Sequence, residues 1–184
     1  MRHRIVYTRI ADGGVSVCGP APEIITALGS GGLWAGRPRG FAERQIASMI
    51  ARGVLPDAAR NYARAIVLGG CSTQEALAII RDRDCAHLGR QIELWDVDDI
   101  PSDRWFRDAW SRSHNGGPIV IDLRKARRIQ WQRIKAAIAA HNGQRQALGR
   151  KPRPVMWGEV GSAIRHARDS DELRRVWPEV LNGA

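Results

Sequence analysis

Residues 118–143 read PIVIDLRKARRIQWQRIKAAIAAHNG, and the rest of the chain is organised around this stretch. The β-branched run at 119–121 is typical of a short strand. Asp122 occupies the position of a helix N-cap, and a helical pattern follows it as far as Asn142-Gly143. The stretch therefore predicts a strand over 119–121 and a helix over 122–141.

The predicted helix has two different faces. When its residues are placed at 100° per residue, most of the apolar side chains fall in one sector. That sector contains Leu123, Ala126, Gln130, Trp131, Ile134, Ala137 and Ile138. A second sector contains Arg124, Lys125, Arg128 and Lys135. Arg127 falls inside the apolar sector and Arg133 at its border, so the separation of the faces is imperfect.

The charge of the protein is concentrated around this helix. Residues 112–153 contain eleven Lys or Arg and one acid, Asp122, which gives the net charge of +10 that the whole protein carries. The remaining residues hold 18 basic and 18 acidic side chains, which cancel. Two plainer readings stay open: an ordinary solvated helix face, and a genome that favours Arg, since 26 of the 29 basic residues are Arg.

The basic residues continue past the helix into a linker that contains Pro and is expected to be extended. A local field of one sign attracts phosphate groups or an acidic surface. We therefore predict that nucleic acid or an acidic protein surface binds here. The predicted contact residues are Arg124, Lys125, Arg128, Lys135, Arg150, Lys151 and Arg153.

The predicted fold is α+β with a small antiparallel sheet. Residues 4–18 form a β-hairpin pattern around a Gly-Gly turn, and 91–97 alternates as a further strand. We expect these strands to pair, with 119–121 as a candidate additional strand. The 122–141 helix should pack on the sheet through Ile134 and Ile138, because it carries the longest apolar stripe.

Residues 41–86 contain three helical patterns, with a capping-box sequence, Ser72 to Glu75, at the start of the third. We predict a helical insertion over 36–88 within an α+β core formed by 1–35 and 89–184. A helix-turn-helix regulator that reads DNA is the alternative for these helices. The third helix carries Arg-Asp-Arg-Asp at 81–84, and these charges cancel, which favours the plain insertion. Two further short helices are expected over 157–168 and 170–177.

Catalytic and metal-binding patterns are weak in this sequence. Four Asp residues between 96 and 103 lack the glycine and the closing Glu of a calcium loop, so helix capping is the expected role. His114 and Asn115, near Asp108, are the one constellation that suggests an enzyme, and a turn is the usual place for such residues. We expect no cofactor and no metal, and we favour a binding protein over an enzyme.

The three cysteines, Cys18, Cys71 and Cys85, form no C-x-x-C motif and are odd in number. A disulfide framework is therefore not expected, and Cys71, Cys85 and His87 fit no zinc spacing. Buried thiols are the expected state of these residues. The chain also lacks the run of ~20 apolar residues that crosses a bilayer, so we expect no membrane partner and a cytoplasmic location.

Several stretches resemble a family of small uncharacterised proteins of tailed phages and prophages, which are often encoded near tail and virion genes. The resemblance lies in RIVYT at 4–8, DGGV at 12–15, DDIPSDRWFRDAW at 98–110, IDLRKAR at 121–127 and DELRRVWP at 171–178. It implies an accessory or virion-assembly protein in the host cytoplasm or in a virion, with other virion proteins as candidate partners. Residues 30–90 look like an insertion relative to shorter members, and the family supplies no catalytic residue to transfer.

Overall fold

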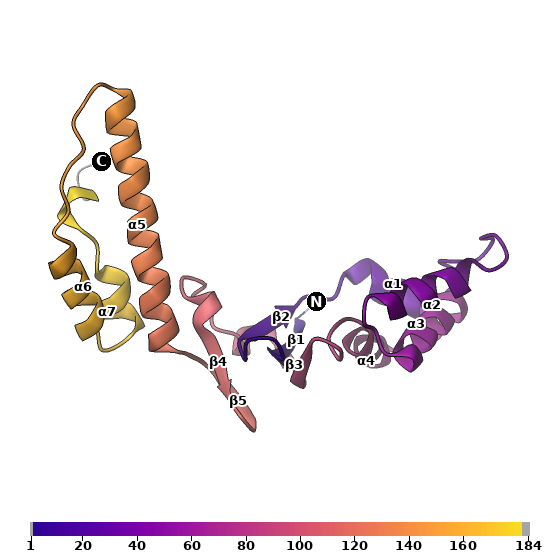
Figure 1. Cartoon of the computed structure of the whole chain (residues 1–184). Coiled ribbons are helices and arrows are strands. Elements are labelled where there is room, and N and C mark those ends of the chain that lie inside the picture. The colour runs from indigo at the N-terminus through magenta and orange to yellow at the C-terminus, as the bar shows by residue number, and fades with distance from the viewer. Residues whose placement is uncertain (1, 182–184) are drawn as a thin grey trace. The chain divides into compact units, whose positions relative to one another are not determined.

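The computed structural model describes residues 2–181 and divides the chain into two compact units (Figure 1). The first unit, called here the N-terminal unit, extends to Pro101 and includes Arg112–Gly117. The second, the C-terminal unit, contains Ser102–Ser111 and the residues from Pro118 onward. Helices and short antiparallel sheets make up an α+β fold, which confirms the predicted class.

The N-terminal unit contains a three-stranded antiparallel sheet in the order β2-β1-β3. Its strands are β1 (His3–Arg9), β2 (Val15–Cys18) and β3 (Gly89–Asp96). Adjacent residues Ile5 and Val6 of β1 are both fully buried, and since neighbours in a strand point to opposite faces, both faces of the central strand are covered. The predicted pairing of the N-terminal hairpin with the later strand is confirmed.

A bulge interrupts the pairing of β1 with β3 between Val6 and Thr8. Gln91 lies in this bulge with φ of 54°, in the left-handed region that G1-type bulges use. Its side-chain oxygen accepts a hydrogen bond from the Thr8 hydroxyl at 3.0 Å, and its side-chain amide donates to the carbonyl of Ser113 at 3.3 Å. These two hydrogen bonds offset the free-energy cost of a positive φ in a residue other than glycine.

Arg112 fastens the 112–117 turn to the bulged strand. Its guanidinium is buried and donates to the Glu93 carboxylate at 2.7 Å, to the carbonyl of Gln91 at 3.0 Å and to that of Gly117 at 3.0 Å. It also lies over the ring of Trp95, 4.9 Å from the centroid. Arg112 belongs to the basic stretch of the sequence, but its charge is used inside the protein.

Replacing Arg112 by Met should therefore lower the free energy of unfolding of this unit by about 2–3 kcal/mol, because three acceptors lose a buried donor. The Trp95 indole N–H and then Arg112 hold the pKa of Glu93 below its usual range. This stabilisation is present above the pKa of a free Glu and is lost as pH falls through the lower folded-state pKa. Urea unfolding should be measured at pH 7 and at acid pH. The difference in free energy of unfolding between Arg112→Met and wild type should be smaller at acid pH. The control is Arg90→Met, since exposed Arg90 has no ion pair within residues 2–181; equal losses in both variants would contradict the role of Arg112.

Four helices complete the N-terminal unit: α1 (Pro22–Ser30), α2 (Phe41–Ala51), α3 (Pro56–Leu68) and α4 (Thr73–Asp84). The last three confirm the three predicted helices, and Ser72 and Glu75 form the predicted capping box of α4. Helix α1 was not predicted, because the glycines that follow it indicated a flexible connection. Helix α3 packs against α1, α2 and α4, and its buried alanines allow this close approach.

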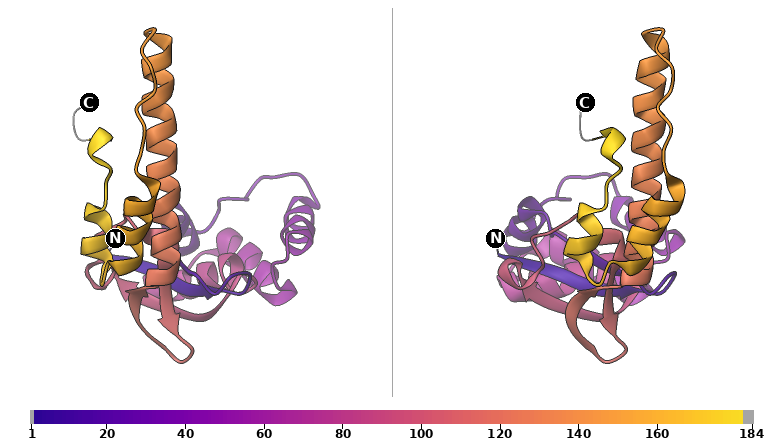
Figure 2. Two further views of the ribbon diagram at one scale, coloured as in Figure 1. Left: turned by 60° about the vertical axis from the view of Figure 1, so that its left-hand side comes forward. Right: turned by 90° about the vertical axis from the view of Figure 1, so that its left-hand side faces the viewer.

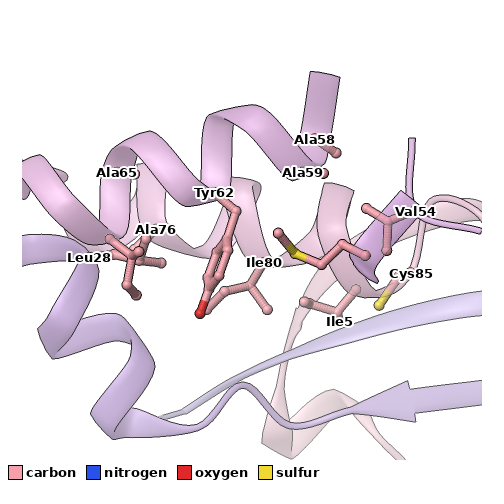
Figure 3. Close-up of a cluster of buried hydrophobic side chains, with 12 residues drawn as sticks. Ile5, Leu28, Val54, Ala58, Ala59, Tyr62, Ala65, Ala76, Ile80 and Cys85 are labelled. Atoms are coloured by element: carbon pink, nitrogen blue, oxygen red, sulfur yellow. The ribbon is translucent and has the colours of Figure 1, made fainter. Parts of the chain in front are cut away.

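The core of this unit joins the helices to the sheet. Ile5 of β1 belongs to the same buried cluster as Tyr62 of α3 and Ile80 of α4, and Figure 3 shows these side chains converging. The compact unit thus extends as far as Pro101. This division differs from the predicted one, in which residues 36–88 are an insertion within a core formed by 1–35 and 89–184. The predicted insertion implies that a chain without residues 36–88 stays folded, and this remains a prediction; the core that these helices share with Ile5 argues instead that the deletion unfolds the sheet.

The C-terminal unit is built around α5 (Leu123–Ala147). Helices α6 (Trp157–His166) and α7 (Ser170–Arg175) pack against it, as do the short 3-10 segments η2 (Arg107–Ala109) and η3 (Glu179–Leu181). A third 3-10 segment, η1 (Val97–Asp99), follows β3 and belongs to the N-terminal unit. Figures 1 and 2 show α6 and α7 beside the first half of α5.

Two predictions about the middle of the chain were wrong. Ile134 and Ile138 are buried as expected, but they pack with Val160, Ile164 and Leu173 of the C-terminal unit and not on the three-stranded sheet. Residues 119–121 do not extend that sheet either. They belong to β5 (Gly116–Ile121), which pairs with β4 (Trp110–Ser113) in a separate two-stranded sheet. An apolar stripe indicates that a surface is covered, but it does not identify the partner.

Candidate nucleic-acid interface

Helix α5 begins as the sequence predicted and ends later. The Asp122 carboxylate accepts a hydrogen bond from the backbone N–H of Lys125 at 3.1 Å, which confirms the N-cap. The predicted end at Asn142-Gly143 is wrong, because the helix continues to Ala147. The chain turns at Gly149, whose φ of 69° is typical of the glycine after a helix, and the Arg150 N–H donates to the carbonyl of Arg145.

One face of α5 forms the core of its unit. Ala126, Gln130, Ile134 and Ile138 are buried. The polar side chain of Gln130 is satisfied there, because its oxygen accepts from the Trp105 indole N–H at 3.1 Å and its amide donates to the Val176 carbonyl at 2.9 Å. This face fixes which way the remaining side chains of the helix point.

Two arginines of α5 also serve the interior. Arg127, which the helical projection placed in the apolar sector, donates to the carbonyl of Ala167 at 2.9 Å. Arg133 lies over the ring of Trp105, 4.4 Å from the centroid. These contacts explain why the helix tolerates charge on its apolar side. Neither arginine belongs to the candidate interface.

The four basic residues predicted on the other face do lie together on the outside of α5. Arg124, Arg128 and Lys135 are exposed and Lys125 is half-buried. None of these four side chains has an ion pair or a hydrogen bond with another described residue of the chain. With a rise of 1.5 Å per residue, Arg124 and Lys135 are about 16 Å apart along the helix axis. We call these four residues the basic face.

The three predicted residues beyond the helix lie beside its far end. After Gly149 the chain runs back along α5 in an extended segment, residues 150–155, which we call the strap (Figure 2). The backbone N–H of Arg153 donates to the Asn142 side-chain oxygen at 2.9 Å, and the Asn142 side-chain amide donates to the Arg153 carbonyl at 3.3 Å. Arg145 donates to the carbonyl of Lys151 at 2.9 Å.

The strap continues the row of charges. At 100° per residue, Asn142 lies in the same direction from the helix axis as Arg124, about 27 Å further along. Asn142 holds the backbone of Arg153, and Arg145, which projects nearer the direction of buried Ile138, holds the carbonyl of Lys151, so the strap runs along the border between the basic face and the core face. Arg150, Lys151 and Arg153 are all exposed. The structure thus brings the seven predicted residues onto one helix and its strap.

The position of the basic face works against the stability of the helix. The first turn of α5 contains no acidic residue, and Arg124 and Lys125 lie at its positive end. Each cation at a helix N-terminus costs about 0.3–1 kcal/mol in place of the gain that an acid would bring. No Asp or Glu occurs between Asp122 and Glu159 to neutralise these charges. Folding alone does not account for this arrangement.

An aromatic pair borders the basic face and was not singled out from the sequence. Trp131 is three residues from Arg128 and four from Lys135, so both are its neighbours on the helix surface. Trp157, which is 38% exposed, packs edge-on against Trp131 with ring centroids 5.2 Å apart. Aromatic rings beside cations are a common arrangement in proteins that bind single-stranded nucleic acid. The helical projection placed Trp131 in the core sector; it does pack on the core cluster, but its side chain is only half-buried.

The other candidate sites have structural roles in the described residues. Asp96 accepts from the N–H of Asp98 as a cap, and Asp103 accepts from the N–H of Trp105 and pairs with Arg174. No group of three or more His, Cys, Asp or Glu side chains within residues 2–181 could hold a metal ion. His114 and Asn115 lie exposed in the turn between β4 and β5.

The third of the helices considered for sequence reading of DNA, α4, carries paired charges. In α4, Arg81 pairs with Asp82 at 2.7 Å and Arg83 with Asp84 at 2.6 Å, as the sequence had indicated. No helix among the described residues is both long enough and apolar enough to cross a membrane. No protein-family model, curated protein or solved structure matches this chain. Inferences about function therefore rest on the geometry of α5 and its strap.

Proposed function

We propose that this chain is a nucleic-acid-binding accessory protein of the phage or prophage type, which holds the phosphate backbone along α5 and the strap. One observation carries the proposal: the four basic side chains of the basic face and the three of the strap are exposed or half-buried, lie on one helix and the segment beside it, and have no acidic partner among the described residues. Arg124 and Asn142 are about 27 Å apart along the helix axis, and one strand of B-DNA passes roughly eight phosphates over that length of its own axis. Such a set of cations binds a polyanion, and it needs no catalytic group to do so.

The proposed mode of binding is electrostatic and has little sequence preference. The basic face offers charge, whereas base reading requires bidentate side chains directed at base edges. The Trp131–Trp157 pair adds a surface on which an unpaired base can stack, so single strands should bind at least as well as duplexes. The resemblance to proteins of tailed phages supplies the setting, an accessory or assembly role around packaged or replicating nucleic acid.

Fluorescence anisotropy with a labelled single strand and a labelled duplex, at several salt concentrations, tests the proposal. Four phosphate contacts predict a slope of log K against log salt of about −3 to −4 on duplex, and all seven residues predict about −6. Changing the base sequence should alter the affinity little. Binding that is absent, or that does not depend on salt, would contradict the proposal.

An acidic protein surface is the second candidate partner, because the same unpaired cations suit a row of carboxylates. Protein partners present fewer and less regular charges than a phosphate backbone, so their binding should show a shallower dependence on salt. If nucleic acid fails to bind in the anisotropy experiment, this candidate takes its place.

A further inference from the structure

Two of the three cysteines lie together in the N-terminal unit, although they are 67 positions apart in the sequence. Cys18 ends β2, opposite Ile5 in the ladder with β1. Cys85 is the C-cap of α4, and Figure 3 shows it beside Ile5. Residues directly opposite each other in a ladder point to the same face, so Cys18 and Ile5 face the same way, and both cysteines belong to the packing of the core cluster that contains Ile5.

The two thiols differ in exposure and in environment. Cys85 is 1% exposed, whereas Cys18 is half-buried and can be reached from solvent. The neighbouring Cys85 thiol lowers the pKa of Cys18 to about 7, against the effects of burial and of the Asp84 carboxylate, and the Arg83 guanidinium adds to the lowering. The neighbouring Cys18 and then burial raise the pKa of Cys85. The phenol of Tyr7 is the other titratable group that faces both thiols.

We propose that Cys18 and Cys85 are a redox-active dithiol, in which Cys18 is the attacking nucleophile and Cys85 the resolving thiol. Accessible thiols of low pKa with a second thiol in contact are the sites that low-molecular-weight disulfides oxidise first. This modification site is independent of nucleic-acid binding, which uses residues of the C-terminal unit.

The reaction with oxidised glutathione balances as two exchanges. The Cys18 thiolate attacks one sulfur of the glutathione disulfide, the S–S bond breaks, and one glutathione leaves as a thiolate. Cys85 then loses its proton to solvent, and its sulfur attacks the Cys18 sulfur of the mixed disulfide, releasing the second glutathione. Two protein thiols are oxidised by two electrons to one disulfide, and glutathione disulfide is reduced to two thiols.

The bond would close a loop of about 68 residues and tie the edge strand β2 to the end of α4. A cross-link over so long a loop restricts the unfolded chain strongly, so the oxidised protein should be more stable than the reduced one. We expect its Tm to be roughly 5–15 °C higher, and reduction by a small thiol should reverse the change.

The test incubates the full chain with oxidised glutathione, followed by thiol counting in denaturant and peptide mapping without reductant. Wild type should lose two of its three thiols and yield one peptide pair that joins Cys18 to Cys85. Cys71→Ser, the matched control, should also lose two thiols. Cys85→Ser should instead accumulate one glutathione on Cys18, because the resolving thiol is absent, and Cys18→Ser should form neither product.

Iodoacetamide labelling of wild type provides a measurement that does not depend on the variants folding. The alkylation rate of Cys18 should rise with pH around a midpoint near 7. Three thiols remaining in wild type after oxidation, a bridge that uses Cys71, or a midpoint near that of a free cysteine would each overturn the proposal.

Discussion

Replacing Arg124, Lys125, Arg128 and Lys135 together by Gln is expected to weaken nucleic-acid binding by roughly 10²–10³-fold at 0.15 M salt. The figure follows from counterion release, since each phosphate contact contributes a factor of about five at this ionic strength, and four contacts multiply. The slope of log K against log salt should become shallower by about 3 to 4 at the same time. Anisotropy titrations of the variant and wild type over a salt series measure both quantities.

The matched control removes the same charge from the N-terminal unit. Arg39, Arg44, Arg64 and Arg90 are exposed, and no ion pair joins them to other residues within 2–181. Changing these four to Gln also lowers the net charge from +10 to +6. If binding depends on the row along α5, the control should keep most of its affinity and slope. Equal losses in both variants would show that net charge alone attracts the polyanion, and the proposed interface would be wrong.

Both variants should remain folded, because the substituted side chains are not part of the core. Gln is a good helix former, and removing cations from the first turns of α5 relieves an unfavourable interaction with the helix dipole. The variant of the basic face is therefore expected to be as stable as wild type or slightly more so. A basic face that destabilises its own helix is what a binding role predicts, since functional sites are where stability is given up.

The parts of this fold that could be predicted from sequence are those with local causes. The capping box at Ser72 lies within four residues, and the hairpin at 4–18 depends on one turn. The two faces of α5 follow from its own period, which also placed Arg127 on the inner side, where it is found. The end of α5 was missed because Gly143 resembles a helix stop, whereas Gly149, six residues later, has the required positive φ.

The parts that could not be predicted depend on contacts between distant segments. The strap lies beside α5 because Asn142 bonds to Arg153, and an Asn in a sequence does not reveal its partner. Likewise, the pairing of Cys18 with Cys85 requires the sheet and α4 to be in place. Of the candidate interface, the residues on the helix followed from periodicity, whereas their alignment with the strap required the structure.

Helix α1 was missed for a related reason. The glycines around Trp34 and Gly36 indicated a flexible connection, but the glycines just before them, at 29, 31 and 32, form a junction with the end of α3. Gly31 and Gly69 end the two helices with φ of 73°, and the chains that follow them exchange backbone hydrogen bonds. The Gly32 N–H donates to the Val67 carbonyl at 2.8 Å, and the Gly70 N–H donates to the Gly29 carbonyl at 2.7 Å. Each helix thus satisfies carbonyls that the other leaves without a partner.

This junction leads to the second large effect, a loss of about 4 kcal/mol or more in the free energy of unfolding for Gly69→Ala. A Cβ on Gly69 would meet the backbone of residues 30 and 31, within 2.5 Å of the Ser30 carbonyl carbon. Backbone atoms cannot move aside as a side chain would, so the two helices must separate or the bonds between them must break. The positive φ adds about 1 kcal/mol or more for any residue with a Cβ.

Gly70→Ala separates the steric clash of a Cβ from the cost of a positive φ. Gly70 has φ of 85°, yet a Cβ there would meet no atom within 4 Å. This variant should therefore lose only the conformational part, about 1–2 kcal/mol. Urea unfolding followed by circular dichroism would compare the two variants with wild type. Because α1 and α3 share the core cluster with Ile5, the larger loss at Gly69 should unfold the helices and the sheet of the N-terminal unit in one transition. Equal and small losses at Gly69 and Gly70 would mean that the two helix ends do not meet as described, and that α1 packs on α3 without this junction.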